Sequence, residues 1–331
     1  MDLVKAITLC EVWPRDGLQS EKTLLTTEQK VELINDMTAA GFRVIEVGSF
    51  VNPKAVPQMA DTDDVFTRIA KAPDVEYRAL IANLRGVRRA AGCGCRKVKL
   101  NVSASTAHNL ANLNCTPSES VAGFKSCVEE AQNCNIAVSG SISMAFGSPW
   151  DKEIPIGDVK KVVEAYLAAG VTEISLSDAA GVAYPSQVFD MGKEMLQEYP
   201  QVKWWLHFHN TRGLGIANIL AGMEAGFTNY DTSFGGVGGC PFVPGAAGNV
   251  TTEDVLHMCE QMKITTGIDL DLAMAVSKKA VSMLGHGTDS YLLRAGKAGD
   301  LIRELPKGQI ENQVIIKNIP PADSHAGAQP V

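Results

Sequence analysis

Two histidines in the second half of the chain are spaced so that they could bind a metal ion. His207 and His209 lie in the segment WWLHFHN, which is otherwise apolar until its last residue. In a β-strand, side chains two positions apart point to the same face. Two imidazoles on one face favour a divalent metal site, although a hydrogen-bonded pair in the core would have the same spacing.

Arg15 and Asp16 form a second candidate pair, directly after the first apolar segment of the chain. Polar residues that follow the carboxyl end of a predicted strand, as these do, are candidates for a functional site. The alternative is a surface ion pair that stabilises a turn at Gly17.

A glycine-rich segment, GGVGGCPFVPGAAGNVTTED, follows the last predicted strand. Its glycines give a backbone that could move over a ligand. Cys240, between Gly239 and Pro241, is a candidate acid, base or nucleophile. Asn249 stands just before a predicted helix start at TTED; its amide oxygen could bind a hard metal, or the residue could only belong to the helix entry.

These residues need a scaffold that brings distant segments together, and the chain predicts one. Short β-rich segments alternate with longer helical ones, the pattern of parallel βα units. We expect eight strands, at Lys5–Val12, Arg43–Val47, Glu76–Ala82, Lys97–Ser103, Ala137–Met144, Glu173–Leu176, Lys203–Phe208 and Asn229–Ser233. Such units close into an α/β fold, a (β/α)8 TIM barrel, whose active site lies at the carboxyl ends of the strands.

The domain organisation follows from this pattern. We expect a catalytic barrel over residues 1–285, with additional C-terminal helices over residues 286–318. After Val250 the chain favours helices and shows no clear strand. The Pro- and Ala-rich residues 319–331 are predicted to form a disordered tail. Gly41 and Gly170 precede strands and are expected to end helices.

Composition excludes several classes of protein. A net charge of −7 over 331 residues argues against a sequence-independent nucleic-acid binder. No signal peptide or membrane span is indicated, so we expect a cytoplasmic protein with neither nucleic acid nor membrane as a partner. The eight cysteines are expected to be free thiols, and the pair Cys93 and Cys95 lacks a second pair to complete a zinc site.

Five segments, in order, resemble the 3-hydroxy-3-methylglutaryl-CoA lyase family of the DRE-TIM metallolyase superfamily. They are EVWPRDGLQSEK, VIEVGSFVNPKAVPQMAD, LSDAAGVAYP, HFHNTRGLG and GVGGCPFVPGAAGNVTTEDVLHM. The resemblance covers about residues 3–285. It implies a metal-dependent carbon–carbon lyase that cleaves a 3-hydroxy-3-methylglutaryl-CoA-like substrate to acetyl-CoA and a keto acid, which is acetoacetate for HMG-CoA itself.

The resemblance also implies roles for individual residues. The metal ligands would be Asp16, His207, His209 and Asn249, with Mg²⁺ or Mn²⁺ as the cofactor. The catalytic residues would be Arg15 for the enolate oxygen, Cys240 as the thiol acid, His207 or Asp16 as the base, and Glu46 and Asp178 as supporting or catalytic carboxylates. Asn112 and Asn114 would contact the coenzyme A part of the substrate. We also expect a homo-oligomer.

Two departures from the family pattern bear on the substrate. Trp13 replaces a glycine and is expected to narrow or reshape the acyl pocket. The lysines that the family carries near the nucleotide are absent from the segment ending in Asn112, Leu113, Asn114 and Cys115. The basic residues expected to take over the phosphate contact are Arg88, Arg89, Arg96 and Lys97.

Three rival functions remain. The chain could cleave a related acyl-CoA such as citramalyl-CoA or a longer-branched glutaryl-CoA, or it could run the bond-forming direction, as Claisen-type synthases such as isopropylmalate synthase do. A non-catalytic metal-binding barrel is disfavoured by the presence of Arg15, Asp16 and Cys240 together.

Overall fold

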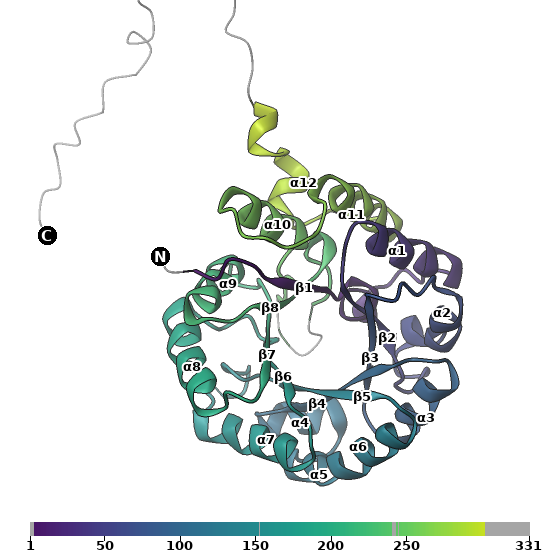
Figure 1. Cartoon of the computed structure of the whole chain (residues 1–331), viewed down its shortest axis with the longest axis vertical. Helices are drawn as coiled ribbons and strands as arrows, with labels where there is room; N and C mark the ends of the chain where they lie inside the picture. Colours follow the sequence, from purple (N-terminus) through teal and green to yellow (C-terminus); the bar gives the residue numbers. More distant parts are fainter. Residues whose placement is uncertain (1–2, 152, 240–242, 244, 302–331) are drawn as a thin grey trace, which may run out of the picture. The chain divides into compact units, whose positions relative to one another are not determined.

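The computed structural model is a closed barrel of parallel strands surrounded by helices (Figure 1). It describes residues 3–301 apart from residues 152, 240–242 and 244. The strands pair in chain order and close between the first and the last. They are β1 (Thr8–Glu11), β2 (Val44–Ser49), β3 (Glu76–Ile81), β4 (Lys97–Ser103), β5 (Ala137–Ser143), β6 (Glu173–Asp178), β7 (Lys203–Phe208) and β8 (Asn229–Thr232). The predicted TIM barrel is confirmed.

The helices form the outer ring of the barrel. They are α1 (Thr27–Ala39), α2 (Thr62–Arg68), α3 (Leu84–Gly92), α4 (Thr106–Leu113), α5 (Pro117–Ala122), α6 (Phe124–Asn133), α7 (Ile156–Ala168), α8 (Pro185–Glu198), α9 (Gly215–Ala225), α10 (Thr252–Gln261), α11 (Leu270–Leu284) and α12 (Tyr291–Ala295). Short helical turns occur at η1 (Trp13–Gly17), η2 (Leu18–Ser20), η3 (Pro57–Met59), η4 (Phe234–Gly236) and η5 (Ala298–Leu301). No described helix is long and apolar enough to cross a membrane.

The predicted strands are all present, and they differ from expectation mainly at their ends. The first strand begins at Thr8 because the residues before it pair elsewhere: the N–H of Thr265 donates to Lys5 O at 2.9 Å, and the N–H of Ile7 donates to Thr265 O at 2.9 Å. The sixth strand continues to Asp178. Gly41 and Gly170 have positive φ values of 102° and 85°, as expected where helices end before strands.

Residues Met1–Ala295 form one compact unit, and the boundary of this unit falls before Gly296. The first ten residues of the expected C-terminal extension therefore belong with the barrel. Residues 302–331 lie outside the described part of the chain, so the division between a helical extension and a tail stays a prediction.

The main hydrophobic core lies between the strands and the helices, whereas the inside of the barrel is largely polar. On β5 the outward residues are Val138, Gly140 and Ile142, and Gly140 has no side chain because the ring of Tyr166 packs there: an added Cβ would lie 2.7 Å from it. The alternate positions carry serines. This leaves hydrogen-bonding groups facing the barrel axis.

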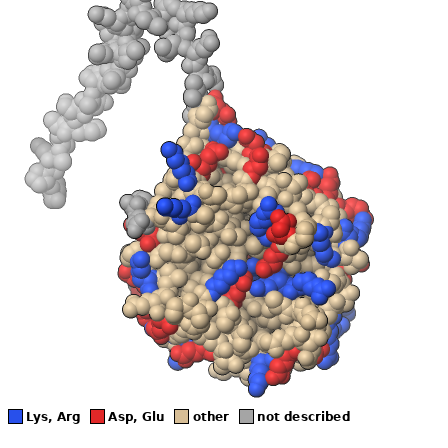
Figure 2. Space-filling view, viewed as in Figure 1, with Lys and Arg blue, Asp and Glu red and all other residues tan. Residues whose placement is uncertain are grey.

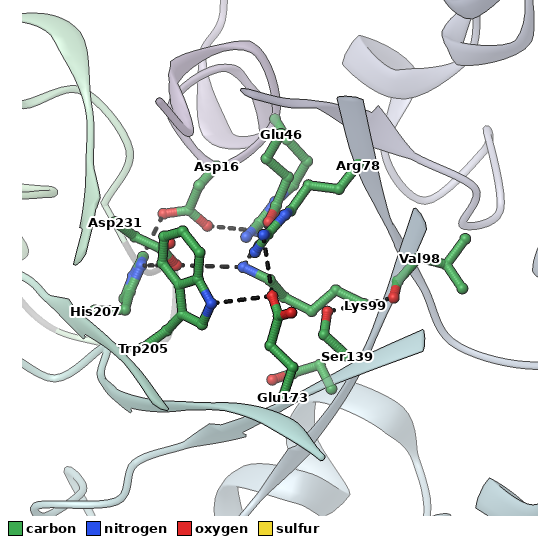
Figure 3. A network of polar contacts seen from close by, with 12 residues as sticks. Asp16, Glu46, Arg78, Val98, Lys99, Ser139, Glu173, Trp205, His207 and Asp231 are labelled. Atoms are coloured by element: carbon green, nitrogen blue, oxygen red, sulfur yellow. Dashed lines mark hydrogen bonds and ion pairs between the residues drawn. The ribbon is translucent and has the colours of Figure 1, made fainter. Parts of the chain in front are cut away.

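A buried ionic cluster fills the amino-terminal end of the barrel (Figure 3). The guanidinium of Arg78 lies 4.5 Å from the ring centre of Trp205, and its Nη2 lies 3.1 Å from Glu173 Oε1. The indole N–H of Trp205 donates to the same Glu173 oxygen at 3.0 Å. Arg78 and Glu173 are paired with neighbouring charges, and neither residue lines the cavity described below.

Trp13 does not shape the acyl pocket, and that expectation is wrong. Trp13 is the first residue of η1, and its side chain is 0% exposed and packs in the main hydrophobic core. The indole ring also lies against Gly17, where an added Cβ would meet it at 3.3 Å. Trp13 supports the turn that carries Arg15 and Asp16 from behind.

We therefore predict that Trp13→Ala lowers the free energy of unfolding by about 3–5 kcal/mol, the usual loss for a fully buried tryptophan. Denaturant titration of the two proteins measures this. A variant of unchanged stability with an altered preference among acyl-CoA substrates would restore the pocket assignment.

Candidate active site

Three predicted metal ligands meet at the carboxyl end of the barrel. The Nε2 atoms of His207, on β7, and His209, just after it, are 3.1 Å apart. Asp16 Oδ2 lies 3.9 Å from the first and 3.6 Å from the second. All three groups are buried, and one ligand atom from each lies within 4.8 Å of the others. The expected juxtaposition of η1 and β7 is confirmed.

Asn249, the fourth predicted ligand, lies in the same cluster. Its Nδ2 donates to Asp16 Oδ2 at 2.7 Å and to the carbonyl of Val237 at 3.0 Å. Its Oδ1 is buried and has no hydrogen-bond partner among the described residues. A buried carbonyl oxygen without a partner is costly unless it binds a ligand.

The donor set fits a divalent cation. It combines a carboxylate, an unpartnered amide oxygen and two imidazole nitrogens that face each other, so the four side chains offer nitrogen and oxygen ligands. Burial lowers the pKa of His209, so its imidazole is neutral at neutral pH and keeps a lone pair for a metal. Burial would raise the pKa of Asp16, but the charge of Arg15 and the nearby imidazoles hold it well below its usual range.

A chain of buried ion pairs orients the cluster (Figure 3). Arg15 pairs with both Asp16 and Glu46. Lys99, on β4, continues the chain: its Nζ lies 2.6 Å from Glu46 Oε2 and 3.2 Å from Asp231 Oδ2. The same Asp231 oxygen lies 3.3 Å from Nδ1 of His207. A carboxylate on Nδ1 leaves Nε2 directed toward the candidate metal position.

Glu11 joins the two loops that carry the ligands. Its Oε1 accepts hydrogen bonds from the N–H groups of Trp13 and Phe234, both at 3.0 Å. Its Oε2 accepts from the Thr252 hydroxyl at 2.7 Å. Glu11 points away from the barrel axis on β1, so it holds η1 and η4 together from outside the cavity.

The structure places Glu46 in this network and Asp178 elsewhere. Both oxygens of the buried Asp178 accept backbone hydrogen bonds, from Val182 at 3.0 Å and Ala183 at 2.9 Å. Burial raises the pKa of Asp178 to about 6, and these hydrogen bonds oppose the shift. Because both oxygens are engaged, the geometry indicates that Asp178 shapes the loop after β6.

A cavity of about 1080 Å³ opens beside the cluster. Arg15, Asp16, His207 and His209 line one side of it, and Lys99 and Asp231 line it deeper in the barrel. Its mouth runs over the loops after β2 and β3, where Phe50, Val51, Val56, Arg85 and Arg89 are among the lining residues. This volume is sufficient for a large organic ligand.

The remaining predicted residues divide by position. Asn112, near the end of α4, lines the cavity. Asn114 ends that helix in a left-handed conformation with φ of 55° and is not among the lining residues. Cys240 lies outside the described residues, so its catalytic role stays a prediction.

Of the four basic residues expected at the phosphates, only Arg89 lines the cavity. Arg88 pairs with Glu130 at 2.7 Å on the outer helices. Arg96 and Lys97 lie at the amino-terminal start of β4, at the end of the barrel opposite the ligands, so their assignment is wrong. Arg85 was missed: it lines the mouth and forms no ion pair among the described residues.

Sequence reasoning also missed Lys99, Asp231 and Glu11. Lys99 and Asp231 lie at inward-facing positions of β4 and β8. Asp231 is in register with His207, which is one of the predicted metal ligands. Strand alternation could have shown them, because a charged residue at an inward barrel position is almost never fully buried unless it is paired. Glu11 carries no such pattern, because its partners lie in loops.

Comparison with known proteins supports the class that this site defines, a metal-binding TIM barrel with a mixed carboxylate–histidine centre. The family model HMGL-like matches residues 6–279, so the chain belongs to the HMGL-like family. A hydroxymethylglutaryl-CoA lyase of Bacillus subtilis is 38% identical over 298 residues, which cover 90% of this chain and 100% of the relative. A 3-hydroxy-3-isohexenylglutaryl-CoA/hydroxymethylglutaryl-CoA lyase of Pseudomonas aeruginosa is also 38% identical and covers 90% and 98%.

A solved structure of a relative has a closely similar fold. The HMG-CoA lyase of Acinetobacter baumannii, in complex with coenzyme A and 3-methylmalate, superposes with a TM-score of 0.87 at 43% identity. The match covers 91% of this chain and 98% of that chain. On the face drawn in Figure 2, acidic and basic side chains lie beside one another.

We predict that His207→Ala and His209→Ala each weaken Mn²⁺ binding by at least ~10–100-fold, the loss that even outer partners of a metal site produce. Isothermal titration calorimetry measures the affinity directly. His257→Ala, on α10 and outside the cluster, is the matched control and should bind Mn²⁺ as the wild type does. Undiminished affinity in both histidine variants would contradict the ligand assignment.

Proposed function

We propose that this protein is a divalent-metal-dependent carbon–carbon lyase for 3-hydroxy-3-substituted glutaryl-CoA substrates. For HMG-CoA the products are acetyl-CoA and acetoacetate. One observation carries the proposal: the cluster of Asp16, His207, His209 and Asn249 faces a large cavity with Arg15 beside it, in a chain of the HMGL-like family.

The proposed ligand set favours Mg²⁺ or Mn²⁺. Oxygen ligands from Asp16 and Asn249 suit a hard cation, and two imidazoles are compatible with Mn²⁺ in particular. A cation bound there would lower the pKa of the substrate's 3-hydroxyl and hold that hydroxyl close to the distal carboxylate.

The protein's own groups then carry out the proton transfers and stabilise the charge. His207 or Asp16 takes the proton of the 3-hydroxyl as the C2–C3 bond breaks and a ketone forms at C3. The bond's electron pair moves onto the thioester, and the Arg15 guanidinium stabilises the resulting enolate oxygen. Cys240 donates a proton to C2, which completes acetyl-CoA.

Coenzyme A is proposed to enter across the loops after β2 and β3. That side of the cavity combines apolar residues, which suit the pantetheine arm, with Arg85 and Arg89 at the mouth. Arg89 is held by Asp63 and donates to Val51 O at 2.9 Å, whereas Arg85 is exposed. Arg85 is therefore the better candidate for a phosphate contact, and Asn112 also lines the cavity.

The proposed activity is tested with purified protein and a panel of 3-hydroxyacyl-CoAs that includes HMG-CoA and citramalyl-CoA, assayed with and without Mn²⁺. We expect metal-dependent release of acetyl-CoA from a 3-hydroxy-3-substituted glutaryl-CoA, abolished by EDTA and restored by Mn²⁺. Condensation of acetyl-CoA with a keto acid, without cleavage at any acyl-CoA, would support a synthase instead.

The proposed role of Cys240 gives a further prediction. Cys240→Ser keeps the size of the side chain but replaces the thiol with a much weaker acid. It should lower kcat by roughly two to four orders of magnitude, the usual range for general acid–base catalysis, with little change in KM. Cys259→Ser, at a buried cysteine on α10, is the control for the loss of a thiol as such. Near-wild-type turnover by Cys240→Ser would remove the thiol from the mechanism.

A further inference from the structure

The deep part of the cavity has a polar wall that the proposed chemistry does not use. We define this polar wall as Asn101 on β4, Ser141 and Ser143 on β5, and Ser177 on β6, all of which line the cavity. On these three strands every lining residue is polar. The apolar residues that strands contribute, Leu80 and Ile81, lie on β3.

Asn101 and Ser141 of the polar wall lie across the barrel from Asp16 and Asn249, whereas Ser177 is in register with His207 on the neighbouring strand β7. In a closed ring of eight strands taken in order, β5 is opposite β1 and β4 is opposite β8 (Figure 1). Asp16 follows β1 and Asn249 follows β8. A group attached to a carbon held at the ligands, and pointing away from them, therefore points toward Asn101 and Ser141.

The hydrogen-bonding groups of the polar wall are available to a ligand. Ser143 donates to Asn101 Oδ1 at 2.7 Å, which fixes the amide and leaves its Nδ2 without an acceptor among the described residues. The hydroxyls of Ser141 and Ser177 face the cavity, and neither donates to another described residue. When substrate displaces water from this wall, these groups need a new partner.

Three of the four groups on C3 of the proposed substrate are already accounted for. The 3-hydroxyl and the arm bearing the distal carboxylate go to the metal side, and the thioester arm runs toward the mouth over β2 and β3. The fourth group, the C3 substituent, remains for the polar wall. A methyl group there would leave the amide and hydroxyl donors without partners, and it would gain no apolar contact from β4, β5 or β6.

From this placement we propose that the preferred substrate carries a hydroxylated C3 substituent, recognised by Asn101 and Ser141. The inference rests on the proposed lyase activity and names its substrate class. For 3-hydroxy-3-(hydroxymethyl)glutaryl-CoA, the same C2–C3 bond breaks, the 3-hydroxyl proton leaves, and C2 gains a proton. The products are acetyl-CoA and 4-hydroxy-3-oxobutanoate, so the reaction balances without any further reactant.

The test compares kcat/KM for that substrate and for HMG-CoA, with Mn²⁺ present. The wild type should favour the hydroxymethyl substrate by about 10- to 100-fold, because a site with hydrogen-bonding groups rejects an analogue that lacks the matching hydroxyl. Asn101→Leu and Ser141→Ala should each lower this preference by at least ~10-fold. Ser139→Ala is the matched control: its side chain faces inward two positions earlier on β5, donates to Val98 O at 3.3 Å and does not line the cavity.

The outcomes separate the two proposals. Equal or better cleavage of HMG-CoA by the wild type overturns the hydroxylated substituent and leaves the lyase standing. A loss of kcat/KM by the same factor for both substrates in Asn101→Leu and Ser141→Ala also overturns it, and would place the distal carboxylate on the polar wall. Cleavage of neither substrate overturns the lyase proposal and this inference together. Ser141→Ala removes only one oxygen, so the test does not depend on the folding of the leucine variant.

Discussion

The candidate site depends on buried carboxylates that are shared between cations inside the barrel. Glu46 lies between Arg15 and Lys99, and Asp231 lies between Lys99 and His207. Burying an unpaired charge is very costly, so each group in this chain requires its neighbours. The positions of Arg15 and His207, and with them the proposed metal and enolate contacts, therefore depend on Glu46, Lys99 and Asp231.

The charge balance of the network suits its proposed ligands. Asp16, Glu46 and Asp231 are held in their charged forms, since Arg15 and Lys99 lower the pKa values of these carboxyls against the effect of burial. Among these side chains, three carboxylates against Arg15 and Lys99 leave one excess negative charge. A divalent cation reverses that excess and prepares the cavity for an anionic substrate.

Much of this was predictable from the sequence, and the reasons are local. The alternation of strands and helices predicted the barrel, and the spacing of His207 and His209 predicted a shared face, because both follow from backbone geometry alone. The roles of Trp13, Arg96 and Lys97 were mispredicted because sequence proximity to a motif does not tell which end or face of a strand a residue occupies. Glu11 and Lys99 act through partners more than 30 residues away, and only the closed barrel brings those partners together.

The Glu11 contacts have a consequence for how the site is made. Asp16 comes from the first strand's loop, and Asn249 from the segment after the last strand. Glu11 links these two loops through Phe234 and Thr252. A growing chain that has not yet reached Asn249 lacks both the fourth candidate ligand and the link through Thr252, however well its earlier strands have paired. The complete set of four candidate ligands therefore forms only when the first and last strands of the ring come together.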